Sequence, residues 1–382
     1  MPRLLVLNQY YVPGREATAR LLTELCESLA GDFEITVVTG TTAGAGPGVD
    51  WRNEVKIVRV PSTAFDRTRM PLRAANYLTY LMLALVRGMT VARPDLVFAQ
   101  TDPPFVGLVA LLVARRFGVP LVVGVKDLLP ETAVEFGGLR SPLPAGAIRR
   151  AIDSYLRRAD RVVAIGETMR RRLEDRGVER VTVIPDWVDT DAIRPLAQES
   201  DGRFVVMHSG NVGHTQDLDT LVAAAREVPE VDVVIVGAGS RWAELERLAS
   251  GVPNVSFRPY VPYERLAESL SSATLHFVGL ASGLSGYVIP SRLYGVLAAG
   301  RPVLVAAEAD SEAAQLVTRA SCGIVVSPGR SGEVAAAIRA ARNGEYDLRA
   351  MGERGRRFIV EYGNRAKAVE RYRELFAGLL RA

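Results

Sequence analysis

Short runs of apolar residues recur along the chain, and each is followed by a longer stretch in which apolar residues return every three or four positions. Such short, unbroken runs are typical of strands buried on both faces of a parallel sheet, and the stretches between them have the period of covering helices. In the first half the expected strands are residues 4–7, 35–38, 57–60, 96–99, 121–125, 162–165 and 181–184. In the second half they are residues 204–208, 231–236, 255–257, 274–278, 303–306 and 324–326.

This rhythm stops and restarts once, near residues 189–202. That segment, DTDAIRPLAQESDG, loses apolar periodicity and collects polar and turn-forming residues. A chain of 382 residues is also too long for one ordinary core. We therefore expect an α/β protein with two doubly wound, Rossmann-like domains, residues 1–190 and 191–352. Residues 353–382 predict a long amphipathic helix, interrupted at Gly363–Asn364, with no strand after it.

Composition narrows the functional classes. Hydrophobic residues make up 48% of the chain, as in folded globular proteins. The net charge is only +4 and no basic stripe alternates with aromatic residues, so a nucleic-acid partner is not expected. Cys26 and Cys322 lie far apart and have no metal-ligand spacing, which indicates reduced thiols in the core of a cytosolic protein. Asn8 and Gln9 interrupt the apolar run at the N-terminus, so we expect a strand there rather than a signal peptide.

The excess positive charge lies in the first half of the chain. Residues 1–190 contain 25 Lys and Arg against 21 Asp and Glu, whereas residues 191–382 contain 22 of each. Within the first half, the apolar segment 74–86 is well short of the roughly 20 residues that cross a bilayer, so we expect a buried or interfacial helix. The positive charge is either a solvated surface or a surface that meets anionic lipid. The arginines that flank the segment are Arg67, Arg69, Arg73 and Arg87.

Ligands of doubly wound sheets bind at the carboxyl ends of the strands, so the loops there are the candidate sites. After the strand at 274–278 comes GLSGYVIPSRLYGVLAAGRPVLV, in which Pro290, Ser291 and Arg292 open an apolar helix expected over residues 293–299. Free backbone N–H groups and a guanidinium at such a turn can bind an anion. The alternative is an ordinary turn between a loop and a helix.

Two glycine-containing loops follow the first two strands of the second half. In SGNVGHTQDLDTL, Gly210 and Gly213 allow the backbone to approach a ligand, and a helix expected from Gln216 presents its N-terminus to a phosphate. His214 can donate to a phosphate but is cationic only part of the time near neutral pH, and the alternative is an ordinary surface histidine. The second loop, residues 236–240, has a lone Gly-x-Gly, which is weak evidence by itself. Because they lie in expected strands, His208 and His276 are expected in the core or behind the site.

In their order along the chain, these segments resemble the retaining GT-B glycosyltransferases of family 4. Pro-Ser-Arg followed by Leu-Ala-Ala-Gly-Arg-Pro-Val is similar to a bacterial fucosamine-transferase-like branch, which has Pro-Ser-Lys before the same run. Residues 125–131 and the hinge turn at 184–189 resemble the branch and family motifs as well. The resemblance spans nearly the whole chain. It implies two Rossmann-like domains with a cleft between them and a C-terminal helix that crosses back to the first domain.

The resemblance implies that the second domain binds a nucleoside-diphosphate sugar, for which we expect UDP as the nucleotide. It also implies no metal cofactor, since the family stabilises the leaving diphosphate with helix dipoles and basic side chains. The chain departs from the family pattern at Tyr287 and Gly295, where two glutamates usually hold the donor ribose. The implied donor-binding residues are Gly210, Asn211, Gly213, His214, Gly237, Gly239, Arg258, Tyr260, Pro290, Ser291, Arg292 and Leu293.

The first domain is implied to bind the acceptor. A carboxylate at the end of a strand, such as Asp127 or the weaker candidate Glu131, can orient the acceptor hydroxyl or stabilise positive charge that develops on the sugar ring. The alternative for Asp127 is a cap of the following turn. The other candidates on the acceptor side are Tyr10, Tyr11, Gly14, Arg20 and Asp102.

Related transferases commonly extend polyprenol-linked saccharides. We therefore expect hexosyl or N-acetylhexosaminyl transfer to a lipid-linked saccharide or another hydroxyl, in cell-surface glycan synthesis at the cytoplasmic face of the membrane. The alternatives are a transferase that modifies a soluble natural product, a nucleotide-sugar 2-epimerase of the same fold, and an inactive nucleotide-sugar-binding partner. A Rossmann dehydrogenase is not favoured, because the first strand is not followed by Gly-x-Gly-x-x-Gly.

Overall fold

The computed structural model describes residues 1–14, 17–42, 44–65, 70–134, 142–197 and 202–381. They form two compact units, which are described separately: Met1–Pro185 with Ala366–Ala382, and Asp186–Arg365. The chain thus leaves the first unit after residue 185 and returns to it after residue 365, whereas the sequence places these limits after residues 190 and 352.

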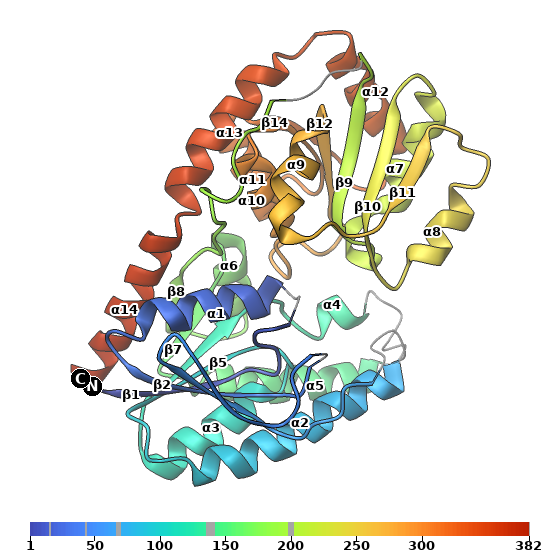
Figure 1. Ribbon diagram of the computed structural model, residues 1–382. Helices are drawn as coiled ribbons and strands as arrows, with labels where there is room; N and C mark the ends of the chain where they lie inside the picture. The colour runs from blue at the N-terminus through green and yellow to red at the C-terminus, as the bar shows by residue number, and fades with distance from the viewer. Residues whose placement is uncertain (15–16, 43, 66–69, 135–141, 198–201, 382) are drawn as a thin grey trace. The chain divides into compact units, whose positions relative to one another are not determined.

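The first unit contains an eight-stranded sheet in the order β3-β4-β2-β1-β5-β6-β7-β8, in which only β3 and β4 pair antiparallel (Figure 1). All strands except β3 lie where unbroken apolar runs predict them. All residues of β3 are exposed, so its sequence has no apolar run from which a strand could be predicted. The strands are β1 Arg3–Leu7, β2 Glu34–Thr39, β3 Gly48–Arg52, β4 Val55–Arg59, β5 Leu96–Gln100, β6 Leu121–Val125, β7 Arg161–Ala164 and β8 Val181–Val183.

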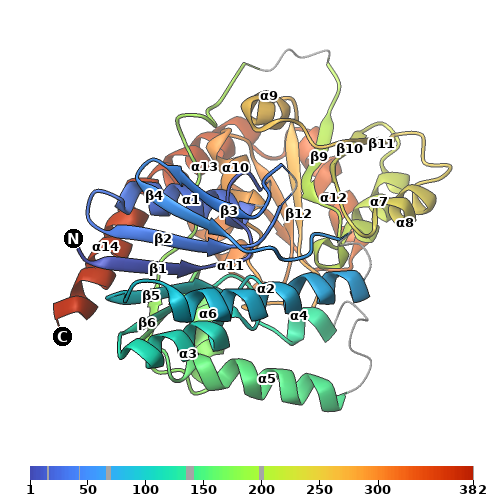
Figure 2. The same ribbon diagram turned by 60° about the horizontal axis from the view of Figure 1, so that its bottom comes forward.

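Helices cover both faces of this sheet, as expected of a doubly wound fold. Two of them, α2 and α3, pack together on one face, whereas α14 lies on the other, where Phe376 contacts Phe33 and Phe98 with ring centroids 6.0 and 5.5 Å apart (Figure 2). No helix in the described ranges is long and apolar enough to cross a membrane. The helices are α1 Ala17–Leu29, α2 Met70–Thr90, α3 Val106–Phe117, α4 Glu131–Val134, α5 Pro142–Leu156, α6 Glu167–Asp175 and α14 Arg365–Arg381.

The second unit contains a six-stranded sheet, all parallel, in the order β11-β10-β9-β12-β13-β14. Every one of these strands was expected from the sequence. The strands are β9 Val205–Asn211, β10 Asp232–Ala238, β11 Val255–Arg258, β12 Leu275–Gly279, β13 Val303–Ala306 and β14 Gly323–Val326. The helices are α7 Leu218–Glu227, α8 Trp242–Leu248, α9 Leu266–Ser271, α10 Arg292–Ala298, α11 Glu312–Ala320, α12 Ser331–Arg342 and α13 Leu348–Tyr362, with 3-10 turns at His214–Gln216 and Tyr263–Arg265.

The two faces of this sheet have separate cores. Phe277 and Leu304 point into one, whereas Val278 and Val305, one residue further along the same strands, point into the other. The first core contains α7 and α12, and the second contains α10, α11 and α13. Helices thus cover both faces of the sheet, and the loops at the strand ends are left accessible to a ligand.

The C-terminal region forms two helices, α13 and α14, that separate at Gly363–Asn364, where the sequence predicts a break. The helical region begins at Leu348, five residues before the expected start. In the second unit, Arg356 of α13 donates hydrogen bonds of 2.8–2.9 Å to the carbonyl oxygens of Thr190, Ile193 and Ala298. Since α14 belongs to the first unit, it is this last helix alone that returns there.

Candidate functional site

The ends of β9 and β10 and the residues directly after them lie so close together that side chains are excluded between them. A Cβ atom at Gly237 would lie 1.8 Å from the carbonyl oxygen of Gly210, and one at Gly239 would lie 2.1 Å from that of Val212. Gly210 and Gly237 also have φ angles of 149° and 151°, a region that favours glycine. Both glycine loops singled out in the sequence therefore meet at one edge of the sheet and present main chain there.

The turn after β9 differs from the sequence prediction of a helix starting at Gln216, which is wrong. His214–Gln216 form a 3-10 turn, and α7 begins at Leu218, because Asp217 adopts a left-handed conformation with φ 48°. The Gln216 side chain instead folds back, and its Oε1 accepts a 2.8 Å hydrogen bond from the N–H of Gly213. His214 is exposed on this turn.

Arg292, the first residue of α10, lies against the β9 loop. Its Nε is 3.4 Å from the position that a Cβ of Gly210 would occupy, and one terminal guanidinium nitrogen lies 3.1 Å from each ring nitrogen of His208. Within the part of the chain that the structure describes, Arg292 forms no ion pair with a carboxylate. Burial lowers the pKa of its guanidinium to about 10, and Tyr260 partly opposes this effect. A partly desolvated cation without a carboxylate partner is suited to receive an anion.

His208 lies beneath this arginine and is fully buried. Its Nε2 is 3.2 Å from the carbonyl oxygen of Asn211, the last residue of β9. Burial, reinforced by the charge of Arg292, lowers the pKa of His208 well below its ordinary value, so the ring is neutral. The sequence placed His208 in the core or behind the site, and both descriptions apply: it is buried and it contacts a candidate site residue.

The remaining donor-side candidates lie around these loops. The adjacent strands β11, β10, β9 and β12 bring their loops to the same edge of the sheet. Arg258 and Tyr260 are exposed at and after the end of β11, and Tyr260 interacts with the backbone of Ala238 and with the charge of Arg292. Before α10, Pro290 is buried and Ser291 is exposed, whereas Leu293 packs in the core. Leu293 therefore anchors the turn and presents no surface to a ligand.

Tyr287 and Gly295 stand where the family pattern has glutamates, so neither position provides a carboxylate. Tyr287 lies in a turn, where its N–H donates to the carbonyl of Leu284. Gly295 lies in α10, and a Cβ there would meet only Leu270 within 4 Å, at 3.5 Å. A carboxylate that sequence reasoning did not single out, Glu308, accepts hydrogen bonds from Ser282 and from the N–H of Gly283, and so supports the loop after β12.

In the first unit, the candidates on the acceptor side follow the neighbouring strands β1 and β5. Tyr10 and Tyr11 are buried, and burial raises the pKa of Tyr11. Gly14 donates its N–H to the carbonyl oxygen of Tyr11 at 2.8 Å, which closes the loop. Asp102 accepts a 3.3 Å hydrogen bond from Thr18 through its side chain, and its main-chain oxygen accepts one from the N–H of Gln9, at 2.9 Å. These contacts bring the two loops together.

The last acceptor-side candidate, Arg20, lies on α1. It pairs loosely with Glu24, one turn further along this helix, at 3.7 Å. Its side chain is part-buried.

The two candidate carboxylates after β6 have different environments. Asp127 is exposed, directly after the buried Lys126. Glu131 instead begins α4 and forms ion pairs with Arg176 and, at 3.6 Å, with Arg149. Asp127 is therefore the carboxylate with the greater access to a ligand.

Arg176 is the centre of this ion-pair group. Its side chain is only 2% exposed, and it lies 3.6 Å from Asp153 and donates a 3.0 Å hydrogen bond to the carbonyl of Leu129. Burial raises the pKa of Asp153, against the opposing effect of Arg176 and its neighbours. The group fixes the segment that follows Asp127.

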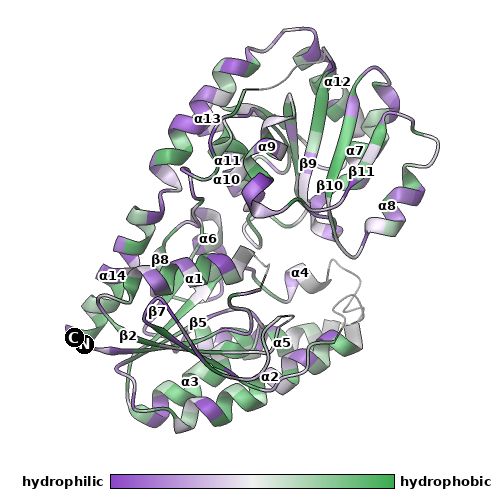
Figure 3. Cartoon of the chain, viewed as in Figure 1, coloured by the Kyte–Doolittle hydropathy of each residue, from purple (hydrophilic) through white to green (hydrophobic). Residues whose placement is uncertain are grey.

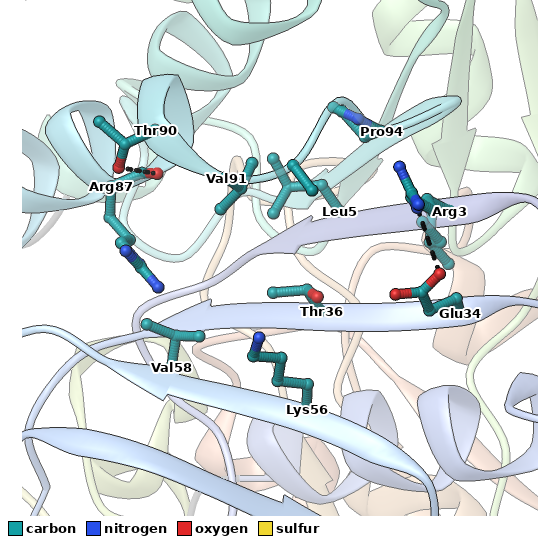
Figure 4. Close-up of a pocket in the computed structure, with 12 residues that line it drawn as sticks. Arg3, Leu5, Glu34, Thr36, Lys56, Val58, Arg87, Thr90, Val91 and Pro94 are labelled. Carbon is teal, nitrogen blue, oxygen red and sulfur yellow. Dashed lines mark hydrogen bonds and ion pairs between the residues drawn. The ribbon is translucent and has the colours of Figure 1, made fainter.

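A pocket of about 130 Å³ lies elsewhere on the first unit, toward the starts of β1, β2 and β4, and none of the candidate residues lines it (Figure 4). Lys56 and Arg87 point toward it, and Arg3 and Glu34 form an ion pair of 3.2 Å at its side. Among the residues that the structure describes, no group of three or more His, Cys, Asp or Glu side chains is placed to hold a metal ion. Cys26 and Cys322 are free and buried.

Models of two glycosyltransferase families match the two halves of the chain. The family model described as "Glycosyl transferase 4-like domain" matches residues 17–187, and that described as "Glycosyl transferases group 1" matches residues 189–358. WcaI of Escherichia coli K12, named as a colanic acid biosynthesis glycosyl transferase, is 26% identical over 89% of this chain and 92% of its own. The alpha-galactosylglucosyldiacylglycerol synthase of Streptococcus pneumoniae is 27% identical over 40% of this chain and 46% of its own.

Solved structures show the same fold. The sucrose-phosphate synthase of Thermosynechococcus elongatus superposes with a TM-score of 0.80 at 18% identity, over 99% of this chain and 100% of that chain. HepE of Anabaena, solved with UDP-glucose, superposes with a TM-score of 0.74 at 15% identity, over 99% and 100%. The expected fold class is thereby confirmed: two Rossmann-like units and a returning C-terminal helix, the GT-B fold.

Proposed function

Because the chain belongs to the group 1 family of glycosyltransferases, we propose that it transfers a sugar from a UDP-linked donor to an acceptor hydroxyl with retention of configuration. The observation that carries the donor half of this proposal is Arg292. Its guanidinium is partly desolvated, lies beside main chain kept bare by Gly210 and Gly237, and has no carboxylate partner in the described ranges. A diphosphate supplies the missing negative charge, and hydrogen bonds between charged groups are the strongest of their kind.

The other donor-side residues surround this position. Gly210, Gly213, Gly237 and Gly239 keep the backbone accessible, and His214 is the second candidate for a phosphate contact. We assign three roles to the remaining residues. Asn211 and Ser291 contact the donor, and Arg258 and Tyr260 contact its nucleoside. Pro290 and Leu293 support the anion-binding turn. The UDP-glucose complex of HepE, which has the same fold, supports the choice of nucleotide.

In this proposal, arginine and backbone N–H groups stabilise the leaving diphosphate, so no divalent cation is required. Asp127 orients the acceptor hydroxyl or stabilises positive charge on the sugar. Glu131, which is paired with Arg176, positions the Asp127 loop. Tyr10, Tyr11, Gly14, Arg20 and Asp102 shape the acceptor side of the first unit.

The surface of the first unit supports an acceptor held at a membrane. Leu78, Met82 and Val86, spaced one helical turn apart on α2, are 59, 61 and 63% exposed. Figure 3 shows α2 and α3 as largely hydrophobic helices, and neither contains an Asp or Glu. Arg73 is exposed on α2, whereas Arg87 points toward the pocket of Figure 4, and Arg67 and Arg69 lie outside the described residues.

An apolar stripe with cations and no carboxylates on its own helix suits the interface of an anionic bilayer. We therefore propose a lipid-linked saccharide as the acceptor, with the protein peripheral to the cytoplasmic face of the membrane. The relative that makes a galactosylglucosyldiacylglycerol supports an acceptor of this class.

Titration of the protein with UDP, GDP and dTDP in the presence of EDTA tests the donor site. We expect UDP to bind most tightly and EDTA to leave its affinity unchanged. Binding that is abolished by EDTA and restored by Mg²⁺ or Mn²⁺ would contradict the metal-independent site.

A second candidate function, an inactive nucleotide-sugar-binding partner of another transferase, is favoured by the absence of carboxylates at Tyr287 and Gly295. Release of UDP from UDP-sugars separates the two functions. Hydrolysis or transfer above the uncatalysed rate establishes an enzyme, whereas binding without any turnover across donors and acceptors favours the partner. Transfer to a soluble scaffold but to no lipid-linked acceptor would favour a natural-product transferase.

A further inference from the structure

His208 contacts Arg292, which lies 84 residues further along the chain, and so joins two parts of the candidate donor site. It lies in β9, three residues before the end of the strand, and its ring is completely buried. The Arg292 guanidinium approaches within 3.1 Å of both ring nitrogens, and the carbonyl oxygen of Asn211 lies 3.2 Å from Nε2. The imidazole thus lies between the end of β9 and the first residue of α10.

A neutral imidazole has one N–H donor and one nitrogen that accepts. Arginine only donates, and a carbonyl only accepts. The ring also interacts with the backbone of Phe277 on the neighbouring strand. One ring nitrogen can therefore donate to these main-chain groups while the other accepts from Arg292. Burial and the guanidinium charge both keep the ring from taking a second proton.

We propose that His208 is a positioning residue that fixes the direction of the Arg292 guanidinium toward the donor diphosphate. The inference rests on the proposed function, in which Arg292 binds that diphosphate. His208 makes no contact with the donor itself and acts through Arg292.

The choice of a neutral partner has a physical consequence. A carboxylate at this place would hold Arg292 more strongly, but it would also neutralise the charge that attracts the phosphates and would compete for the same N–H groups. Histidine accepts a hydrogen bond and leaves the full positive charge in place. Rigid placement of a cation lowers the entropy lost when the ligand binds, because the side chain is already ordered.

The same sheet provides a matched control. His276 lies on β12, the neighbour of β9, and is 1% exposed. Its Nε2 lies 2.9 Å from the carbonyl oxygen of Leu270, and burial lowers the pKa of His276 to about 4. Replacing either histidine removes a buried ring that is hydrogen-bonded to main chain, but only His208 contacts Arg292.

The test uses the full chain with His208→Phe, His208→Gln, His276→Phe, Arg292→Ala and the Arg292→Ala/His208→Phe double variant. Circular dichroism checks that each folds, and titration calorimetry measures the affinity for UDP and for uridine, which lacks phosphates. We expect His208→Phe to weaken UDP binding about tenfold, a change of about 1.4 kcal/mol, and to leave uridine binding nearly unchanged. His208→Gln retains an accepting oxygen and restores UDP affinity to within about threefold of the unsubstituted protein. His276→Phe binds UDP normally.

The double variant separates positioning from general damage. If His208 acts through Arg292, the double variant binds UDP no more weakly than Arg292→Ala alone. Additive losses, or an equal loss of uridine and UDP affinity in His208→Phe, would overturn the inference. If His208→Phe does not fold, His208→Met takes its place, with the same expected results.

The inference and the proposed function fail in different ways. UDP binding that is weakened by Arg292→Ala but not by His208→Phe overturns the positioning role and leaves the diphosphate site standing. UDP binding that is unaffected by Arg292→Ala removes Arg292 from the donor site. The positioning role of His208, which acts through Arg292, is then overturned as well.

Discussion

Gly210 and Gly237 are register partners on β9 and β10, and no side chain can be placed between them. A Cβ atom added to Gly237 would lie 1.8 Å from the carbonyl oxygen of Gly210, far inside the contact distance of the two atoms. Main-chain atoms cannot move away as a flexible side chain does, because β9 is paired with β10 along its whole length and with β12 at Val206 and Met207. Glycine at these two strand ends is therefore a requirement of the fold at the edge that we propose to bind the donor.

Gly237→Ala is expected to destabilise the second unit by about 2–4 kcal/mol, because the added methyl overlaps backbone and the φ of 151° is strained for alanine. Urea-induced unfolding measures the change. Gly332→Ala is the matched control: Gly332 lies in α12 with nothing within 4 Å of its Cβ position, so alanine there should stabilise the helix by up to about 1 kcal/mol. Equal unfolding midpoints for the two variants would contradict the proposed overlap.

Arg292→Ala is expected to weaken UDP binding about tenfold or more, since a hydrogen bond to a charged group is worth roughly 1.5–3 kcal/mol. Arg292→Lys keeps the charge but loses the planar fork, so we expect an intermediate affinity. Calorimetry with UDP and with uridine distinguishes a phosphate contact from a nucleoside contact. A folded Arg292→Ala protein that binds UDP normally would contradict the assignment.

Asp127→Asn retains the shape of the side chain and removes its charge. If Asp127 acts on the acceptor or on the charge of the sugar, this change lowers kcat and leaves the affinity for UDP nearly unchanged. Steady-state turnover and UDP titration of the same preparation measure both quantities. Unchanged turnover would leave Asp127 as a cap of the turn after β6.

Arg176→Met is expected to destabilise the first unit by about 3 kcal/mol, because Glu131 and Asp153 then lose a buried cation. Arg170→Met removes exposed ion pairs on α6 and should barely change the unfolding midpoint. Urea-induced unfolding compares the two. A similar small effect of both would show that the buried group is not required for stability.

Met82→Asp on α2 is expected to abolish sedimentation with anionic liposomes, since it places a carboxylate within the exposed apolar stripe. The unsubstituted protein should bind at low salt and dissociate at high salt. Leu248→Asp, at a 37% exposed position on α8, is the control and should bind as before. Absence of binding by the unsubstituted protein at any ionic strength would favour a soluble acceptor.

Most strands of the protein could be predicted because they are buried on both faces and thus leave unbroken apolar runs. β3 could not, since Val49 and Trp51 lie on an exposed edge strand whose pattern matches that of a loop. The start of α7 was misplaced for a different reason. Asp217 adopts a left-handed conformation and the Gln216 side chain bonds to Gly213, and these local contacts outweigh the propensity to continue a helix.

The candidate site could be predicted as far as local sequence reaches. The glycine loops and Arg292 are recognisable from their own neighbours in the chain, and the structure brings them together at one edge of the sheet. The pairing of Glu131 with Arg176, 45 residues away, has no local signal. The contact of His208 with Arg292 also depends on tertiary structure, and the sequence signal at His208 is only that of a polar residue within a buried strand.

The return of α14 to the first unit determines the order in which the two units can be completed. Phe376 packs against Phe33 and Phe98, so the core of the first unit lacks a large aromatic side chain until the last helix has been synthesised. The second unit, Asp186–Arg365, is continuous in sequence and contains all of its own strands. During synthesis from the N-terminus, the half of the protein that leaves the ribosome first is therefore the half that finishes folding last.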